Sequence, residues 1–195
     1  MTTALHPFSF DRVVQAVELV RERLLRAAGA LERDEIPYAI AGGNAVASWV
    51  ARVDRDAARS TVDVDILVRR EDLEAIKQAL ERVGFVYRRA GGLDMFLDGP
   101  DGRPRSGIHL IFAGEKVREH EPTANPSVAQ HEVAEGAYRV LALDALVQIK
   151  LTAFRDKDRT HLRDFIELGL VDASWLSRLP EALAVRLKQL LDNPE

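Results

Sequence analysis

Two aspartates one residue apart, Asp63 and Asp65, have the type and spacing that best suit metal chemistry in this 195-residue chain. They lie in the segment 61–68, which alternates and is rich in β-branched residues, so we predict a strand there. Side chains two positions apart on a strand share a face, so both carboxylates point the same way. The three alternating apolar residues are expected to point into the core: Val62, Val64 and Ile66.

Neighbouring carboxylates repel each other unless a divalent cation compensates their charge. Mg2+ takes one or two carboxylates and completes its shell with substrate phosphates and water. The same alternation also suits an exposed strand with apolar residues inward and charged residues outward. The pair alone does not distinguish these two interpretations.

A glycine pair, Gly42-Gly43, follows a short apolar segment (38–41, predicted strand) and precedes a predicted helix from Asn44 to about Arg52. Paired glycines let the backbone turn tightly and approach a phosphate closely. The N–H groups and the dipole of a helix N-terminus favour a bound anion, and Asn44 is the expected N-cap residue. The alternative is an ordinary turn between a strand and a helix.

Cations crowd into residues 150–163, interleaved with aspartates. On one unbroken helix Lys150, Lys157, His161 and Asp164 would share a face. There the clustered cations would bind a phosphate group. Two alternatives stay open: a solvated helix of alternating charges, and Asp158 as the cap of a second helix, which would break the shared face.

Composition limits the partners. The net charge is −4 and the pI about 5.8, which argues against broad binding to a phosphate backbone but leaves room for a local basic groove. The absence of cysteine rules out disulfides and thiolate metal sites. Residues 1–7 lack the features of a signal peptide, and no uncharged apolar stretch approaches the roughly 20 residues of a membrane span. We therefore expect a cytoplasmic protein with no membrane partner.

These residues need a scaffold, and the hydrophobic periodicity predicts one. Gly29 is expected to mark the frayed end of the first helix, Gly91-Gly92 a hairpin turn and Pro180 a break. The predicted elements are a helix over 11–33, the strand at 38–41, the helix at 44–52, the strand at 61–68, a helix over 71–83, strands at 85–88, 95–97, 108–112 and 138–141, and helical structure over 144–191. This order indicates an α/β (α+β) fold, with a mixed sheet flanked by helices in residues 1–141 and a helical region packed on it in 142–195.

Three segments together resemble the polymerase-beta-like nucleotidyltransferase superfamily, and most closely its AbiEii-type toxin branch. They are IAGGNAVA (40–47), RSTVDVDILV (59–68) and KLTAFRDKDRTHLRDF (150–165). The resemblance covers roughly residues 36–168. It departs in spacing, because the interval between the glycine pair and the aspartates is longer than in the superfamily, and the polar loop at 53–60 is expected to absorb the excess.

The resemblance implies an enzyme that transfers a nucleoside monophosphate from an NTP, with Mg2+ or Mn2+, to a tRNA, protein or small-molecule acceptor. Asp63 and Asp65 would ligate the metal, and Asp164 would be the candidate base. The phosphates would be bound by Gly42, Gly43, Asn44, Lys150, Arg155 and Lys157. A toxin role with an antitoxin partner is also implied.

His109 stands where the superfamily places a third carboxylate. It is a candidate metal ligand or proton acceptor. The alternative is a catalytically degenerate module that binds nucleotide or a partner protein.

Overall fold

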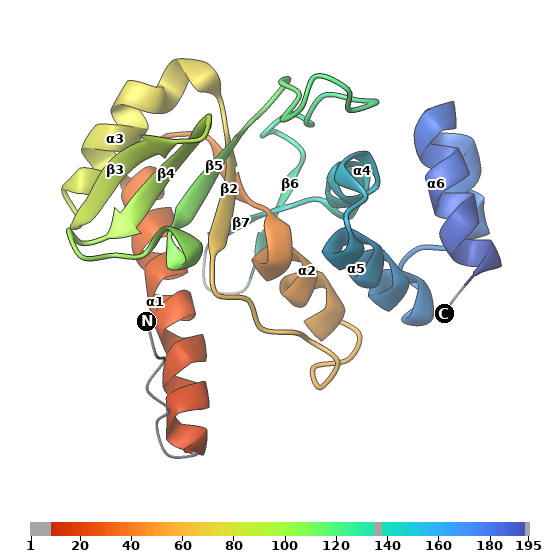
Figure 1. Ribbon diagram of the computed structural model, residues 1–195, viewed down its shortest axis with the longest axis horizontal. Coiled ribbons are helices and arrows are strands. Elements are labelled where there is room, and N and C mark those ends of the chain that lie inside the picture. The colour runs from red at the N-terminus through yellow and green to blue at the C-terminus, as the bar shows by residue number, and fades with distance from the viewer. Residues whose placement is uncertain (1–8, 135–137, 194–195) are drawn as a thin grey trace.

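The computed structural model describes residues 9–134 and 138–193, and its centre is a seven-stranded mixed sheet with helices on both faces (Figure 1). The strands are β1 (Tyr38–Ile40), β2 (Val64–Val68), β3 (Phe85–Ala90), β4 (Leu93–Asp98), β5 (Ile108–Phe112), β6 (His131–Ala134) and β7 (Tyr138–Leu141). Their order is β3-β4-β5-β2-β1-β7-β6. The pairs β1/β7 and β2/β5 are parallel and the other four are antiparallel. The predicted fold class is confirmed.

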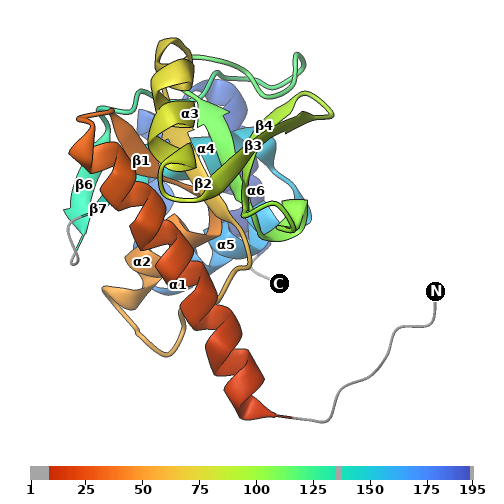
Figure 2. The ribbon, with the colours of Figure 1, turned by 90° about the vertical axis from the view of Figure 1, so that its left-hand side faces the viewer.

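The helices divide between the two faces of the sheet. They are α1 (Phe10–Arg33), α2 (Gly42–Ala51), α3 (Leu73–Glu81), α4 (Leu143–Ala153), α5 (Asp156–Glu167) and α6 (Glu181–Asp192). Helices α1 and α3 cover one face, and α2 with α4, α5 and α6 covers the other (Figures 1 and 2). In the described part of the chain, no helix combines the length and apolar character needed to cross a bilayer.

The alternation of β2 assigns its residues to opposite faces. Val64 and Ile66 belong to the core under α1 and α3, whereas Leu67 belongs to the core under α2 and α4. Asp65 therefore projects toward the α2 side. The prediction for Val62 is wrong: β2 begins only at Val64, so Val62 precedes the strand and is 47% exposed.

The first helix forms as predicted but does not end at Gly29. It continues to Arg33, and a Cβ at Gly29 would meet nothing within 4 Å, so this glycine lies on the open side of the helix. Val13 and Val14 belong to the apolar periodicity that predicts this helix, but they are exposed because the N-terminal half of α1 projects beyond the sheet (Figure 2). The apolar stripe is buried only from Val20 onward.

The positions of turns are predicted better from the sequence than the presence of the edge strand. Gly91 and Gly92 both have left-handed backbone and join β3 to β4 as a two-residue hairpin, which confirms the predicted turn. The predicted break at Pro180 is the N-cap of α6. The exposed edge strand β6 has no counterpart among the predicted elements, because it is short and has little apolar alternation.

Candidate metal and nucleotide site

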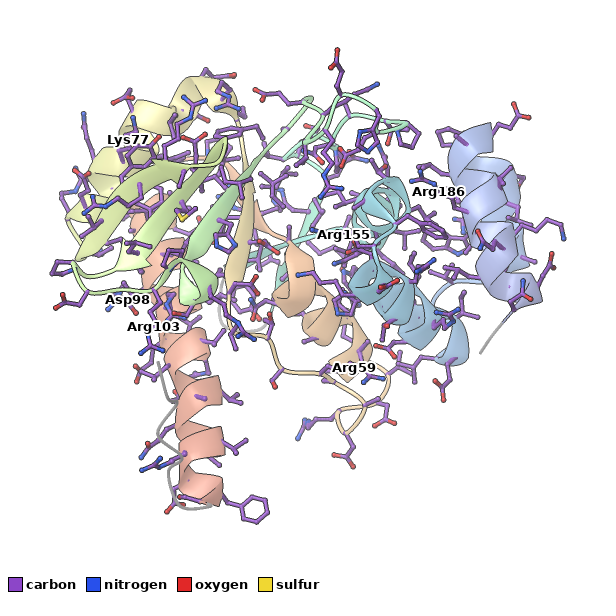
Figure 3. All side chains as sticks on the ribbon, in the orientation of Figure 1. Arg59, Lys77, Asp98, Arg103, Arg155 and Arg186 are labelled. Carbon is purple, nitrogen blue, oxygen red and sulfur yellow. The ribbon has the colours of Figure 1, made fainter. Side chains whose placement is uncertain are left out.

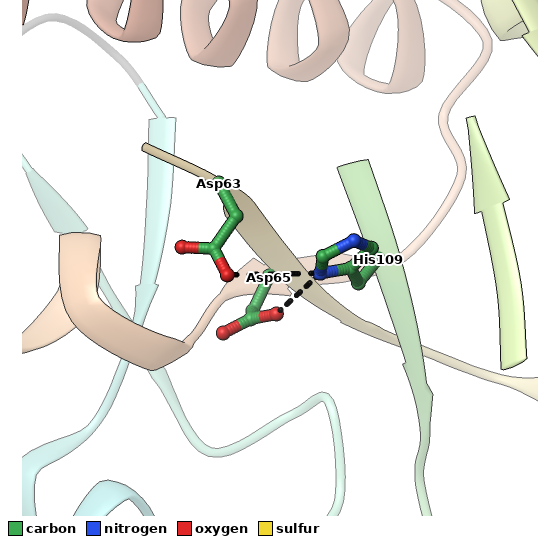
Figure 4. Close-up of side chains that lie close together, drawn as sticks. All are labelled: Asp63, Asp65 and His109. Carbon is green, nitrogen blue, oxygen red and sulfur yellow. Dashed lines mark ion pairs between the residues drawn. The ribbon is translucent and has the colours of Figure 1, made fainter. Parts of the chain in front are cut away.

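The site forms where the neighbouring parallel strands β2 and β5 run side by side. Asp65 on β2 pairs in register with His109 on β5, and Asp63 lies just before β2. One ligand atom from each of the three side chains falls within 4.8 Å of the others (Figure 4). Ligands of an octahedral Mg2+ lie about 2.1 Å from the ion, so separations of roughly 3 to 4 Å suit a single cation. Both carboxylates face His109, so they lie on one side as the sequence predicted, although Asp63 itself precedes the strand.

The glycine bend packs directly against Asp65. Gly42 has φ +62°, and a Cβ built on it would lie 1.9 Å from Asp65 Oδ2. The backbone N–H of Ala41 donates to the Asp65 carbonyl at 2.8 Å. A Cβ on Gly43 would approach the side chain of Thr61 to 3.0 Å. Gly42 is therefore required both by its contact with Asp65 and by its left-handed backbone, whereas at Gly43 a side chain would only crowd Thr61.

Asn44 has a different structural role from the predicted one. The N-cap of α2 is Ala41, so the prediction of Asn44 as the cap is wrong. Because the helix already begins at Gly42, Asn44 lies in its first turn, and its Nδ2 donates to the Asp63 carbonyl at 2.8 Å. Asn44 thus ties the glycine bend to the first aspartate.

Thr61, which the sequence interpretation did not single out, orients the Asp63 carboxylate. Its hydroxyl donates to Asp63 Oδ1 at 2.5 Å. Burial alone would raise the pKa of Asp63, but the Thr61 hydroxyl and the nearby Lys157 outweigh it, so the pKa lies below its ordinary value. Asp63 is therefore an anion at neutral pH, as a metal ligand must be. A threonine two residues before an acid is the only sequence signal for this contact.

His109 faces both carboxylates. Its Nδ1 lies 3.5 Å from Asp65 Oδ1 and 3.7 Å from Asp63 Oδ2. The contact with Asp65 raises the pKa of His109, against the effect of burial and with support from the Pro104 carbonyl. The side chain is 25% exposed, so it reaches the cavity beside the acids.

The cationic segment is split between two helices. Phe154 takes left-handed backbone (φ 50°) between α4 and α5, and Arg155 is the N-cap of α5. The predicted alternative of a second helix is confirmed, but its N-cap is Arg155, and Asp158 is the third helical residue, which accepts from the Arg155 N–H in a capping box. The single face that an unbroken helix would give is therefore absent.

Lys150 is buried, and its Nζ donates to Asp158 Oδ1 at 3.0 Å. Arg155 donates from Nε to the other oxygen of the same carboxylate at 2.7 Å, and about half of its side chain remains exposed. Figure 3 shows Arg155 between the sheet and α4. Asp158 thus joins the buried lysine to the arginine.

A cavity of about 310 Å³ contains the three potential ligands. Arg155, the N-cap of α5, and Lys157 on α5 line it together with the acids, whereas Lys150 and Asp164 are not among the described residues that do. A larger hollow of about 710 Å³ lies between α1 and α2 and is lined mostly by apolar side chains. We assign the site to the smaller cavity because it holds the carboxylates and the cations together.

Asp164 lies on α5 and forms a bidentate ion pair with Arg59 at 3.0 and 3.1 Å. Arg59 belongs to the loop between α2 and β2 and is separated from Asp164 by 105 residues (Figure 3). The side chain of Asp164 is 12% exposed. This pair fastens the long predicted loop to α5, and no local pattern signals it.

Comparison with known proteins identifies the fold of this chain through solved structures. No protein-family model matches the chain, and no curated protein matches it. Among solved structures, the antibiotic-resistance factor ANT(2'')-Ia has a TM-score of 0.54 at 14% identity, with 91% of each chain covered. Its complex with adenylyl-2''-tobramycin has a TM-score of 0.52 at 14% identity, covering 93% of this chain and 99% of that one. An antigenic nucleotidyltransferase-like protein from Paracoccidioides brasiliensis has a TM-score of 0.54 at 18% identity, covering 96% and 90%.

The chain therefore has the fold of nucleotidyltransferases, which supports the predicted polymerase-beta-like resemblance at the level of fold. The AbiEii-type branch stays a prediction based on sequence motifs.

Proposed function

We propose that this protein is a metal-dependent nucleotidyltransferase that transfers a nucleoside monophosphate from an NTP to a hydroxyl acceptor. The observation that carries the proposal is the packing of Gly42 against Asp65, beside Asp63 and His109. A phosphate-binding bend and a cation-binding group are thereby adjacent, as a metal-bound triphosphate requires.

Each residue then has a role toward the substrate. The backbone N–H groups at the start of α2, from Gly42 to Asn44, bind phosphate oxygens. Asp63, Asp65 and His109 hold a divalent cation, Mg2+ or Mn2+, which when bound neutralises charge on the phosphates. These residues fit such an ion because they offer two carboxylates and one imidazole whose ligand atoms lie within 4.8 Å of one another.

The cations of α5 complete the phosphate site. Arg155 presents a guanidinium suited to bidentate phosphate binding, and Lys157 adds a point charge beside Asp63. Lys150 has an indirect role, because its ammonium binds the Asp158 carboxylate that orients Arg155. Catalysis by this arrangement is mostly positioning and charge stabilisation.

The remaining role is that of the general base, which takes the proton from the acceptor hydroxyl. Asp164 keeps this role in our proposal on the sequence resemblance, and its release from Arg59 would be needed first. The acceptor class spans tRNA, protein and small molecules. A neighbour of the same fold was solved with the adenylylated small molecule adenylyl-2''-tobramycin, so small hydroxyl compounds belong in the first screen. The toxin role and its antitoxin partner rest on the sequence motifs alone.

The test offers each α-phosphate-labelled NTP, with Mg2+ or Mn2+, to total tRNA, cell protein and a small-molecule pool. We expect label transfer with matching pyrophosphate release, and its loss in Asp65→Asn. Asp101→Asn, an exposed turn residue, is the matched control and should keep full activity. Heat-shift stabilisation by metal-NTP without any turnover would refute transfer and support the degenerate binding module that His109 suggests.

A further inference from the structure

The imidazole of His109 is oriented by a backbone contact outside the acidic pair. Its Nε2 lies 2.9 Å from the carbonyl oxygen of Pro104. Because a carbonyl oxygen only accepts hydrogen bonds, Nε2 must be the donor. In the neutral ring, the lone pair is therefore on Nδ1. Metal-binding histidines are commonly fixed this way, with one nitrogen bonded to a carbonyl and the other on the ion.

That Nδ1 points at two anions. It lies 3.5 Å from Asp65 Oδ1 and 3.7 Å from Asp63 Oδ2 (Figure 4). A lone pair facing two carboxylates is electrostatically unfavourable. A proton on Nδ1 relieves this repulsion when no ion is bound, and a divalent cation bound among the three atoms would take its place. Thr61 donates to the Asp63 carboxylate and Asn44 to its backbone carbonyl, so this ligand is oriented before any ion binds.

We infer that this site selects a divalent first-row transition ion, with Mn2+ bound in preference to Mg2+. Mg2+ favours all-oxygen shells, whereas a nitrogen ligand favours the transition ions, among which Mn2+ also tolerates two carboxylates. His109, at the position of an expected acid, is thus the residue that sets metal preference. The inference rests on the metal site of the proposed function but not on nucleotide transfer.

The test measures the dissociation constants of Mn2+ and Mg2+ by calorimetry on the full chain without nucleotide. The decisive quantity is the ratio of the two constants, Mg2+ over Mn2+. We expect His109→Asp to lower this ratio at least about tenfold, by restoring an oxygen ligand. His109→Asn removes the imidazole without adding charge and should lower the ratio too, which separates ligand type from net charge. An unchanged ratio in both variants overturns the inference.

Pulsed electron paramagnetic resonance on bound Mn2+ gives a second readout, whose first result comes from the natural protein alone. We expect coupling to a histidine nitrogen in the natural protein, and its absence in His109→Asn. Mn2+ bound without nitrogen coupling would overturn the inference. If the ratio and the coupling behave as expected while no NTP supports label transfer, the proposed function fails and the metal preference stands. If label transfer occurs but the ratio of dissociation constants is unchanged in both variants, the proposed function stands and the metal preference fails.

Discussion

The buried pair of Lys150 and Asp158 gives a prediction whose size follows from its contacts. The two side chains are 3% and 1% exposed and are joined at 3.0 Å. Burial lowers the pKa of Lys150, and Asp158 opposes that effect. Burial would raise the pKa of Asp158, but Arg155 and Lys150 hold it below its ordinary value. Each charge therefore depends on its partners for its presence in the interior.

The partners are unequal. Asp158 also accepts from the Arg155 guanidinium and backbone N–H, so Lys150→Met leaves the carboxylate with two donors. Asp158→Asn instead leaves the Lys150 ammonium buried without a counter-charge. We expect Asp158→Asn to reduce the free energy of unfolding by about 3 to 5 kcal/mol. We expect Lys150→Met, whose side chain has a similar length, to cost about 1 to 3 kcal/mol.

Urea unfolding at pH 7 measures both losses, provided that the dependence on denaturant stays the same among variants. The control is the exposed pair Lys188 and Asp192 on α6, where Lys188→Met and Asp192→Asn should each change stability by about 0.5 kcal/mol or less. The double variant Lys150→Met/Asp158→Leu should lose less than Asp158→Asn alone. A Lys150→Met cost equal to or above that of Asp158→Asn would refute the reasoning, as would losses no larger than those of the α6 control pair.

Three further predictions follow from single residues. Gly42→Ala should destabilise the fold by about 1 to 3 kcal/mol and weaken Mn2+ binding, because its Cβ would displace Asp65 and its φ is +62°. The control Gly29→Ala lies in a helix with open space around it and should stabilise the fold by about 0.5 to 1 kcal/mol. Unfolding curves that show the same stability for both variants would contradict this prediction. Burial, then Lys150, lowers the pKa of His161 from 6.5 to about 4. Between pH 6.5 and 4 only the unfolded chain takes up this proton, so the free energy of unfolding should decrease by up to about 3 kcal/mol as the pH is lowered across that window. Denaturant titration of the two proteins should show that His161→Gln removes this loss. Arg155→Ala should raise the KM for NTP at least about tenfold while Arg103→Ala, an exposed loop change, leaves it unaltered; equal KM values in a transfer assay would exclude Arg155 from phosphate binding.

Local pattern was enough to determine much of the scaffold and the centre of the site. Strand alternation placed Asp63 and Asp65 on one side, because a period of two depends only on backbone geometry. Paired glycines predicted the bend at Gly42, since few residues accept left-handed backbone. The same logic failed at Val62, because β2 begins at Val64, three residues after the predicted start of the strand at Thr61.

What only the tertiary structure decided depends on contacts between distant segments. The approach of Gly42 to Asp65 and the tie from Arg59 to Asp164 join residues 23 and 105 positions apart. No sequence periodicity encodes such pairings, because they arise when separate elements pack. Lys150 shows the consequence: the sequence predicted a phosphate-binding cation, yet the bend at Phe154 directs α5 back so that Asp158 pairs with Lys150 in the interior. The character of the site, two acids with an imidazole facing them and an arginine held by a buried pair, is a product of that packing.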